Sequence, residues 1–114
     1  MKPTPLTGYK PLFAFDVISN DQTMGFVEAY YAPNDPSGVQ IHLEIKEQYR
    51  KRWLTRSLRD ELNQTLNERA KHYGAERVYS VAFLPVSAKL LVFFGFKEFA
   101  QDISPKTYYY KEVN

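Results

Sequence analysis

Four basic residues fall within a short segment of the chain: Arg50, Lys51, Arg52 and Arg56. The pattern of apolar residues predicts that a helix begins here. Backbone N–H groups in the first turn of a helix lack intrahelical acceptors, and the helix dipole adds partial positive charge to them. Basic side chains at this end oppose the dipole, so an anionic ligand explains the cluster better than chance does. We therefore expect a phosphate group to bind here. Two alternatives stay open, a nucleic-acid backbone and a solvated helix start without a ligand.

The segments on either side of this cluster have different periods. Residues 39–46 alternate between apolar and polar side chains, which predicts a strand with one face on the core. After Tyr49 the apolar residues recur every four positions, at Leu54, Leu58, Leu62, Leu66 and Ala70. This spacing predicts an amphipathic helix of about five turns that begins near Arg52 and ends at Gly74.

The remaining segments complete a mixed α+β (α/β) order. Strands are predicted at 12–18, 25–31, 77–83, 96–99 and 107–113, and a short helix at 86–94 that ends at Gly95. Residues 19–23 are expected to form a turn and residues 32–38 a loop. The strand, long helix and strand in the middle require a right-handed crossover and a parallel pair within a mostly antiparallel sheet. Ligands lodge at the carboxyl ends of such a pair, where the basic cluster lies.

Length and composition limit the classes of function. The 114 residues suit one domain, 1–114, with an irregular proline-containing arm at 1–11. The absence of Cys excludes disulfides, thiolate metal sites and a cysteine nucleophile, and two scattered His residues do not predict a metal site. We see no signal peptide and no apolar segment long enough for a membrane span, so the cytosol is the expected compartment. A net charge of +2 makes nucleic acid an unlikely partner.

Two segments carry a resemblance to a known family. Residues 47–58 resemble the pyrophosphate-binding motif of the GNAT (N-acyltransferase) superfamily, Arg/Gln-x-x-Gly-x-Gly/Ala, with Arg50 as the opening residue and Trp53 and Thr55 at the glycine positions. Residues 88–96 resemble a second signature of the family, a short helix that ends in Gly-Phe. The matched order of elements extends from residue 12 to 113, and short phage-borne GNAT-like proteins are similar in having Trp in this loop.

The resemblance implies an acyl-CoA-dependent N-acyltransferase that transfers an acetyl group from acetyl-CoA to an amine within a ternary complex. It implies no metal. Glu44 and His42, on the polar face of the central strand, would act as the base. The residues implied in binding acetyl-CoA are Ile45, Arg50, Lys51, Arg52, Trp53, Leu54, Thr55 and Arg56.

The chain departs from the family pattern in three ways. Both motif glycines are replaced, although glycine is what allows a backbone to approach a ligand closely. Leu84 and Leu91 stand where the family often has an Asn and an acid-acting Tyr. The family's opening strand and two helices, which shape the acceptor pocket, have no counterpart in the pattern. These departures favour an alternative, a catalytically silent GNAT-like phage accessory or virion-associated protein that acts as an interaction module, in the host cytoplasm or the virion.

Two further expectations concern apolar side chains. Trp53 is either a core residue that covers the helix start or a platform for a nucleotide base. A sheet without the missing helices would expose Phe13, Phe15, Val27 and Tyr31, and we therefore expect a homodimer that covers them.

Overall fold

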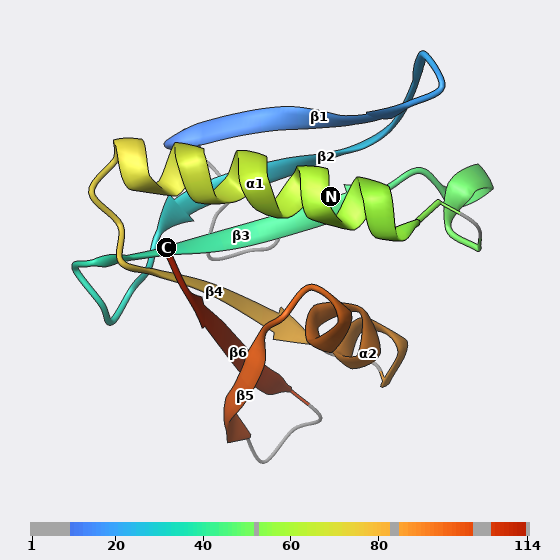
Figure 1. Ribbon diagram of the computed structural model, residues 1–114. Helices are drawn as coiled ribbons and strands as arrows, with labels where there is room; N and C mark the ends of the chain where they lie inside the picture. The colour runs from blue at the N-terminus through green and yellow to red at the C-terminus, as the bar shows by residue number, and fades with distance from the viewer. Residues whose placement is uncertain (1–9, 52, 83–84, 102–105, 114) are drawn as a thin grey trace.

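A computed structural model describes residues 10–51, 53–82, 85–101 and 106–113. Its elements follow the predicted order (Figure 1). In chain order they are β1 (Phe13–Ser19), β2 (Gln22–Tyr31), β3 (Gly38–Ile45), a 3-10 turn (Glu47–Tyr49), α1 (Arg56–His72), β4 (Arg77–Ala82), α2 (Pro85–Phe93), β5 (Lys97–Gln101) and β6 (Thr107–Glu112).

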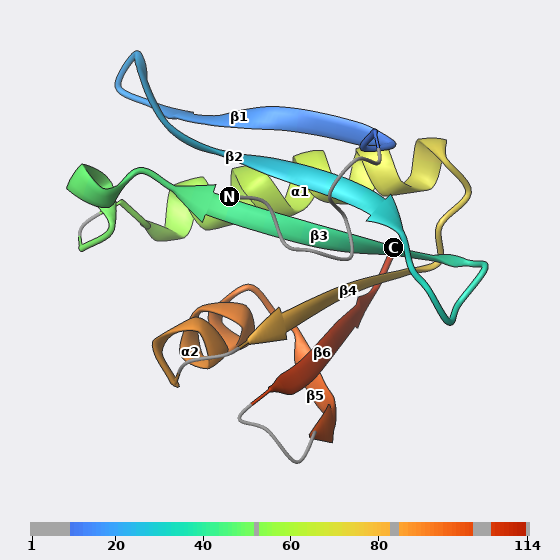
Figure 2. The ribbon, with the colours of Figure 1, turned by 180° about the vertical axis from the view of Figure 1, so that it is seen from behind.

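The strands form one six-stranded sheet in the order β1-β2-β3-β4-β6-β5. Only the β3–β4 pair is parallel, so the predicted mixed sheet with a central parallel pair is confirmed. Helix α1 lies across β1, β2 and β3 in Figure 1 and behind them in Figure 2. Helix α2 packs beside it, since Asn63 of α1 donates a hydrogen bond to the carbonyl of Phe94 (3.2 Å). We call the other side of the sheet the open face.

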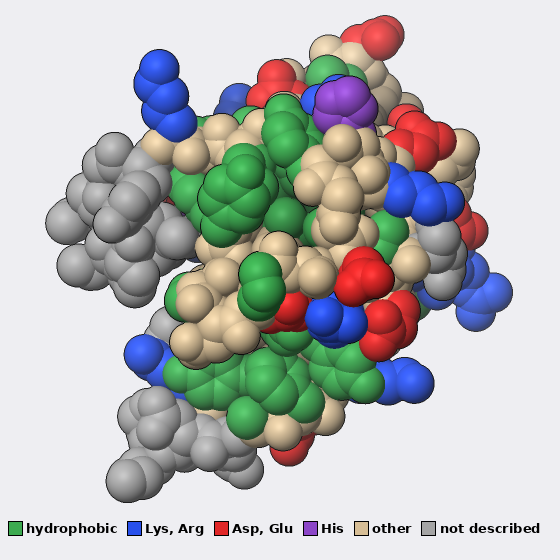
Figure 3. Space-filling model, turned by 90° about the vertical axis from the view of Figure 1, so that its left-hand side faces the viewer, with side chains coloured by type: hydrophobic (Ala, Val, Ile, Leu, Met, Phe, Trp, Pro, Cys, Tyr) green, Lys and Arg blue, Asp and Glu red, His purple; other side chains and the backbone are tan. Residues whose placement is uncertain are grey.

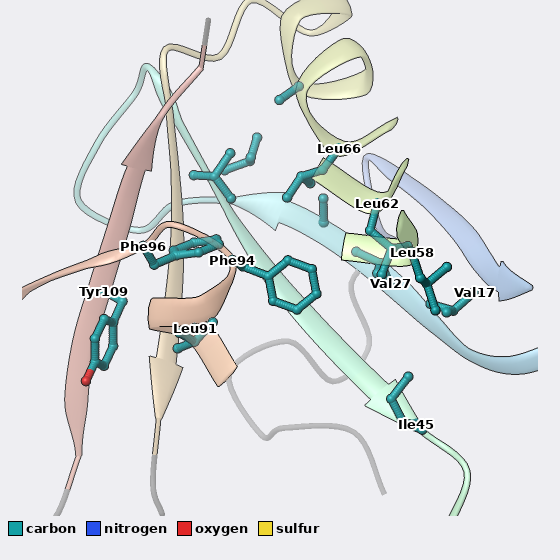
Figure 4. Packing of buried hydrophobic residues seen from close by; sticks show 14 of the residues in the cluster. Val17, Val27, Ile45, Leu58, Leu62, Leu66, Leu91, Phe94, Phe96 and Tyr109 are labelled. Carbon is teal, nitrogen blue, oxygen red and sulfur yellow. The ribbon is translucent and has the colours of Figure 1, made fainter. Parts of the chain in front are cut away.

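The core lies between α1, α2 and the sheet (Figure 4). Leu58, Leu62 and Leu66 of α1 are buried, as their spacing predicted, and they pack over Val17 and Val27 of the sheet. Full burial of a leucine contributes about 1.5–3 kcal/mol, so this row of side chains is what holds α1 to the sheet.

The turn between β1 and β2 is shorter than predicted. It consists of Asn20 and Asp21, with φ of 52° and 62°, in place of the expected turn at 19–23. Asn and Asp enter the left-handed region more readily than other non-glycine residues, so two of them suffice for a hairpin turn. As a result β2 begins at Gln22, three residues earlier than predicted.

Helix α1 begins at Arg56 and not near Arg52. Thr55 is its N-cap: its backbone is extended, and its hydroxyl accepts a hydrogen bond from the N–H of Leu58 (3.1 Å). An N-cap residue has non-helical backbone angles, so Thr55 is the last residue of the loop and Arg56 is the first of the helix. At the other end Gly74 has φ of 76°, and Gly95 has φ of 93° after α2, which confirms both predicted glycine caps.

The expected exposure of the β1 and β2 side chains is wrong for most of them. Phe13 and Val27 are only 6% and 5% exposed, because α1 spans these strands. Phe15 is half-buried against the core, and only Tyr31 is well exposed, at 69%. The reason given for a homodimer therefore fails at these positions. Within the described residues, neither helix is long and apolar enough to cross a membrane.

Candidate functional site

The central feature of the site is the early end of the β3–β4 pairing. The two strands pair at Gly38↔Arg77, Val39↔Val78 and Gln40↔Tyr79. Beyond this point β3 continues to Ile45 and β4 to Ala82 without pairing with each other. We call the space between residues 41–45 and 80–82 the strand opening. It lies at the carboxyl ends of the parallel pair, where the sequence predicted a ligand.

The backbone on the β3 side of this opening is available for hydrogen bonding. The N–H of Lys46 donates to the carbonyl of Met24 on β2 (2.7 Å). Backbone groups alternate in direction along a strand, so even-numbered residues of β3 turn toward β2 and odd-numbered ones toward β4. The N–H and C=O of Leu43 therefore face the opening, beyond the last ladder pair. An extended ligand can pair with them as an added strand would.

A small cavity lies on the helix side of the strand opening. Its volume is about 40 Å³, enough for a group of a few atoms. Ile41 and Leu43 of β3, Ser80 of β4, Leu62 of α1 and Leu91 of α2 contribute to its lining. We call it the inner cavity; its walls are almost entirely apolar.

The loop before α1 supplies a set of backbone donors. In the part of the chain that the structure describes, the N–H groups of residues 53–57 donate to no protein acceptor. The first satisfied N–H is that of Leu58, which Thr55 caps. Unpaired donors at a helix start, together with the helix dipole, form a site for a phosphate.

The basic side chains are spread more widely around this loop than predicted. Only Arg56 lies in the first turn of α1, because the helix begins there. Arg50 folds back on β3, and its Nε donates to the carbonyl of Ile45 (2.8 Å). Ile45 is one of the residues predicted to bind acetyl-CoA, and its carbonyl already accepts this hydrogen bond from Arg50. Lys51 and Arg56 are exposed, and Arg52 lies outside the described residues.

Trp53 is a core residue. Its side chain is 7% exposed, and its ring stacks on that of Phe94, with centroids 6.3 Å apart. The indole is therefore on the inner side of the loop, and of the two predicted roles the structure shows the core one. Leu54 is half-buried and also packs against the core. Because both side chains pack against the core, these two residues present their backbone to the outside of the loop.

His42 and Glu44 lie together on the open face. His42 Nε2 is 3.6 Å from Glu44 Oε1, and the two side chains are 26% and 49% exposed. The His42 ring lies edge-to-face with that of Phe26 (centroids 6.2 Å apart). Leu91, by contrast, is buried beside the inner cavity, so no proton donor stands at that position; Leu84 lies outside the described residues.

A polar cluster centred on Asp35 was missed by the sequence analysis. Its carboxylate accepts two hydrogen bonds from Arg77 (2.7 and 3.2 Å), one from the Tyr79 hydroxyl (2.6 Å) and one from the N–H of Ser37 (2.9 Å). The pKa of Asp35 is held well below its usual value, mainly by the hydrogen bonds from Arg77 and next by the one from Tyr79. The same carboxylate raises the pKa of Tyr79. The cluster joins the β2–β3 loop to β4; the one signal for it is that Arg77 and Tyr79 share a strand face.

A second, larger cavity opens on the open face next to this cluster. Its volume is about 410 Å³, and we call it the outer cavity. Aromatic residues of three strands form one side, Tyr79 of β4, Phe99 of β5 and Tyr108 of β6. Ser80 contributes to the lining of both cavities, so both lie beside the strand opening. Among the described residues no group of His, Asp and Glu is placed to hold a metal ion.

Comparison with solved structures identifies the fold. An acetyltransferase from Thermus thermophilus superposes with a TM-score of 0.69 at 20% identity, over 96% of this chain and 69% of that one. A Bacillus subtilis acetyltransferase in complex with CoA gives 0.64 at 16% identity, over 89% and 76%. The putative acetyltransferase YncA of Salmonella typhimurium, with acetyl-CoA, gives 0.62 at 13% identity, over 83% and 61%.

The chain therefore has the GNAT acetyltransferase fold. No protein-family model matches the sequence, and no curated protein is detectably similar to it. At these identities the likeness establishes the fold alone.

Proposed function

We propose that this protein is an acyl-CoA-dependent N-acyltransferase that transfers an acetyl group from acetyl-CoA to an amine. The observation that carries the proposal is the end of the β3–β4 ladder at Gln40↔Tyr79, which leaves the backbone of Leu43 facing an opening. Two solved neighbours with this fold hold acetyl-CoA or CoA, which supports the choice of ligand.

The loop before α1 would bind the diphosphate of the substrate. Its unpaired N–H groups can donate to phosphate oxygens, and Lys51 and Arg56 lie exposed around it. Trp53 stands at one of the motif glycine positions, but its indole packs inward. The replacement of that glycine therefore does not place a bulky side chain over these donors. Arg50 would contribute through its terminal nitrogens, because its Nε already bonds Ile45.

The strand opening would bind the pantetheine arm. An amide-containing arm can pair with the N–H and C=O of Leu43, as a short strand added to the edge of β3. A backbone N–H directed at the thioester oxygen would polarise the carbonyl and stabilise the charge that develops there. The inner cavity has room for only a few atoms, which favours acetyl over longer acyl groups.

The proposed reaction needs no reactant besides acetyl-CoA and the amine. The amine nitrogen attacks the thioester carbon, the C–S bond breaks, and CoA leaves as a thiolate that takes up a proton. The amine must lose a proton, and His42 with Glu44 would accept it, directly or through a water molecule. Leu91 cannot protonate the thiolate, so water would supply that proton. The rest of the rate enhancement would come from holding the two substrates in the right positions relative to each other.

The test is binding followed by turnover. Saturating acetyl-CoA should raise the Tm by about 5–10 °C. An Arg50→Ala, Arg56→Ala double variant should lose most of that shift, since each charge-assisted bond contributes about 1.5–3 kcal/mol. Lys71→Ala is the matched control, because Lys71 is an exposed cation at the opposite end of the same helix.

Release of free CoA thiol, measured with a panel of amines, then reports turnover. A shift with acetyl-CoA but no thiol release with any amine would favour the silent interaction module. No shift with acetyl-CoA or CoA would refute the proposal. Light scattering separately tests the predicted homodimer.

A further inference from the structure

We infer that the outer cavity is the acceptor site, and that it takes a small primary amine carrying an aryl or branched-alkyl group, not a polyamine. The inference rests on the proposed function, because an acceptor is expected only if the protein transfers an acyl group. Its volume, about 410 Å³, is within the range of small-molecule sites.

The position of the outer cavity fits an acceptor. Gln40, Ser80 and Val81 line it, and these residues stand at the point where β3 and β4 separate. Ser80 also lines the inner cavity, on the helix side of the sheet. An acyl group held in the strand opening would therefore be reached from the outer cavity. His42 follows Gln40 by two residues on the same face of β3, roughly 7 Å along the strand, within reach of an amine through one water.

The walls of the outer cavity are aromatic on the side away from the opening. The ring of Phe99 contacts those of Tyr79 and Tyr108, with centroids 5.6 and 6.2 Å apart. Phe99 is 52% exposed, so this wall is open to a ligand from solvent. Figure 3 shows hydrophobic side chains gathered over β5 and β6, beneath a mixed group of acidic and basic ones. Such a wall suits an aryl or alkyl group, and the ring faces also tolerate an ammonium ion.

The charge of the lining argues against a polycation. Asp35 is the one carboxylate among the described residues that line the outer cavity. It already accepts four hydrogen bonds, and Arg77 neutralises its charge. The other polar residues in the described lining of the outer cavity, Asn34, Gln40 and Ser80, are neutral. They can orient a single amine nitrogen, whereas a second or third ammonium group of a polyamine would face aromatic and alkyl side chains without a counter-charge.

The experiment uses the full chain and two probes, phenethylamine and spermidine, followed by backbone amide NMR shifts with and without saturating CoA. Phenethylamine should shift the amides of Val81, Ala100 and Tyr108, and spermidine should bind more weakly by about tenfold or more. In the turnover assay Phe99→Ala should raise the KM for phenethylamine by about tenfold with a smaller change in kcat. Phe93→Ala is the matched control: Phe93 is a partly exposed phenylalanine on α2, outside the outer cavity.

The outcomes separate this inference from the proposed function. If acetyl-CoA binds but phenethylamine leaves those amides unmoved, or spermidine is preferred, the inference is wrong and the proposed function stands. If acetyl-CoA does not bind while phenethylamine shifts the same amides, the proposed function is wrong, and the outer cavity is still supported as a site for apolar amines. Equal effects of Phe99→Ala and Phe93→Ala on KM would also overturn the inference.

Discussion

Gln40 and Tyr79 are the last two residues that pair across β3 and β4, and each strand continues past its partner. This single relationship places an unpaired strand edge, two cavities and a donor-lined loop at one end of a parallel pair. Ser80, beside this opening, lines a cavity on each side of the sheet.

The cap at Thr55 should matter for both stability and binding. Replacing Thr55 with Ala removes the acceptor for the Leu58 N–H and should cost about 1 kcal/mol in the free energy of unfolding. Because the cap also sets the path of the loop donors, affinity for acetyl-CoA should fall as well. Urea unfolding and calorimetric titration measure the two effects. Thr55→Ser keeps the hydroxyl and should restore both; a serine variant as impaired as the alanine variant would show that the hydroxyl is not responsible.

The Asp35 carboxylate should stabilise the fold only above acidic pH. Its pKa is lowered in the folded protein, so its stabilising effect is complete above the unfolded pKa of about 3.9 and is lost as pH falls toward the lower, folded pKa. Wild type should therefore be more stable than Asp35→Asn at pH 7, and the difference should shrink steadily below about pH 4. Urea unfolding at several pH values checks this. Asp60→Asn, at an exposed carboxylate, is the control. A difference that does not change with pH would contradict the assignment.

Gly25 should be intolerant of any side chain. A Cβ at this position would meet the backbone of β3, at the carbonyl of Glu44 and within 2.8 Å of the Cα of Ile45. Backbone atoms cannot move aside as a side chain can, so Gly25→Ala should destabilise by at least about 2 kcal/mol and displace the end of β3. Gly74→Ala meets open space and suffers only from its positive φ, about 1 kcal/mol. Equal losses for the two variants in urea unfolding would contradict this reading of the contact.

If His42 and Glu44 act as the base, Glu44→Gln should lower kcat about 100-fold and leave the Kd for acetyl-CoA unchanged. Single-turnover and binding measurements separate the two parameters. Glu68→Gln, at an exposed glutamate on α1, should change neither. An unchanged kcat in Glu44→Gln would exclude Glu44 as the base and leave proton removal to His42 or water.

Much of the fold was predictable because its signals are local. The four-residue period of leucines and the alternation along β3 each report burial directly, and Gly74 and Gly95 marked the helix ends where the structure has them. The leucine period predicts too early a start for α1 because Leu54 fits it, although Leu54 packs on the core from the loop before the helix. Thr55, a residue type favoured at N-caps and three residues after Arg52, is the local signal that outweighs it.

The site was less predictable because it depends on tertiary contacts. The sequence predicts Arg50 near the helix start and Glu44 on the polar face of the central strand, but it cannot show that Arg50 bonds the Ile45 carbonyl. Asp35 and Arg77 are far apart in the chain, and nothing local links them. The burial of Phe13 and Val27 likewise follows from the reach of α1 across the sheet, which a strand pattern alone does not reveal.

The most direct test of the central claim is hydrogen exchange at the amide of Leu43, followed by NMR. In the free protein this N–H faces the strand opening, so it should exchange faster than the amides of His42 and Glu44, which face β2. Saturating acetyl-CoA should slow exchange at Leu43 markedly and leave its two neighbours little changed. An exchange rate at Leu43 that stays the same with acetyl-CoA present would contradict the claim that β3 holds the substrate along its unpaired edge.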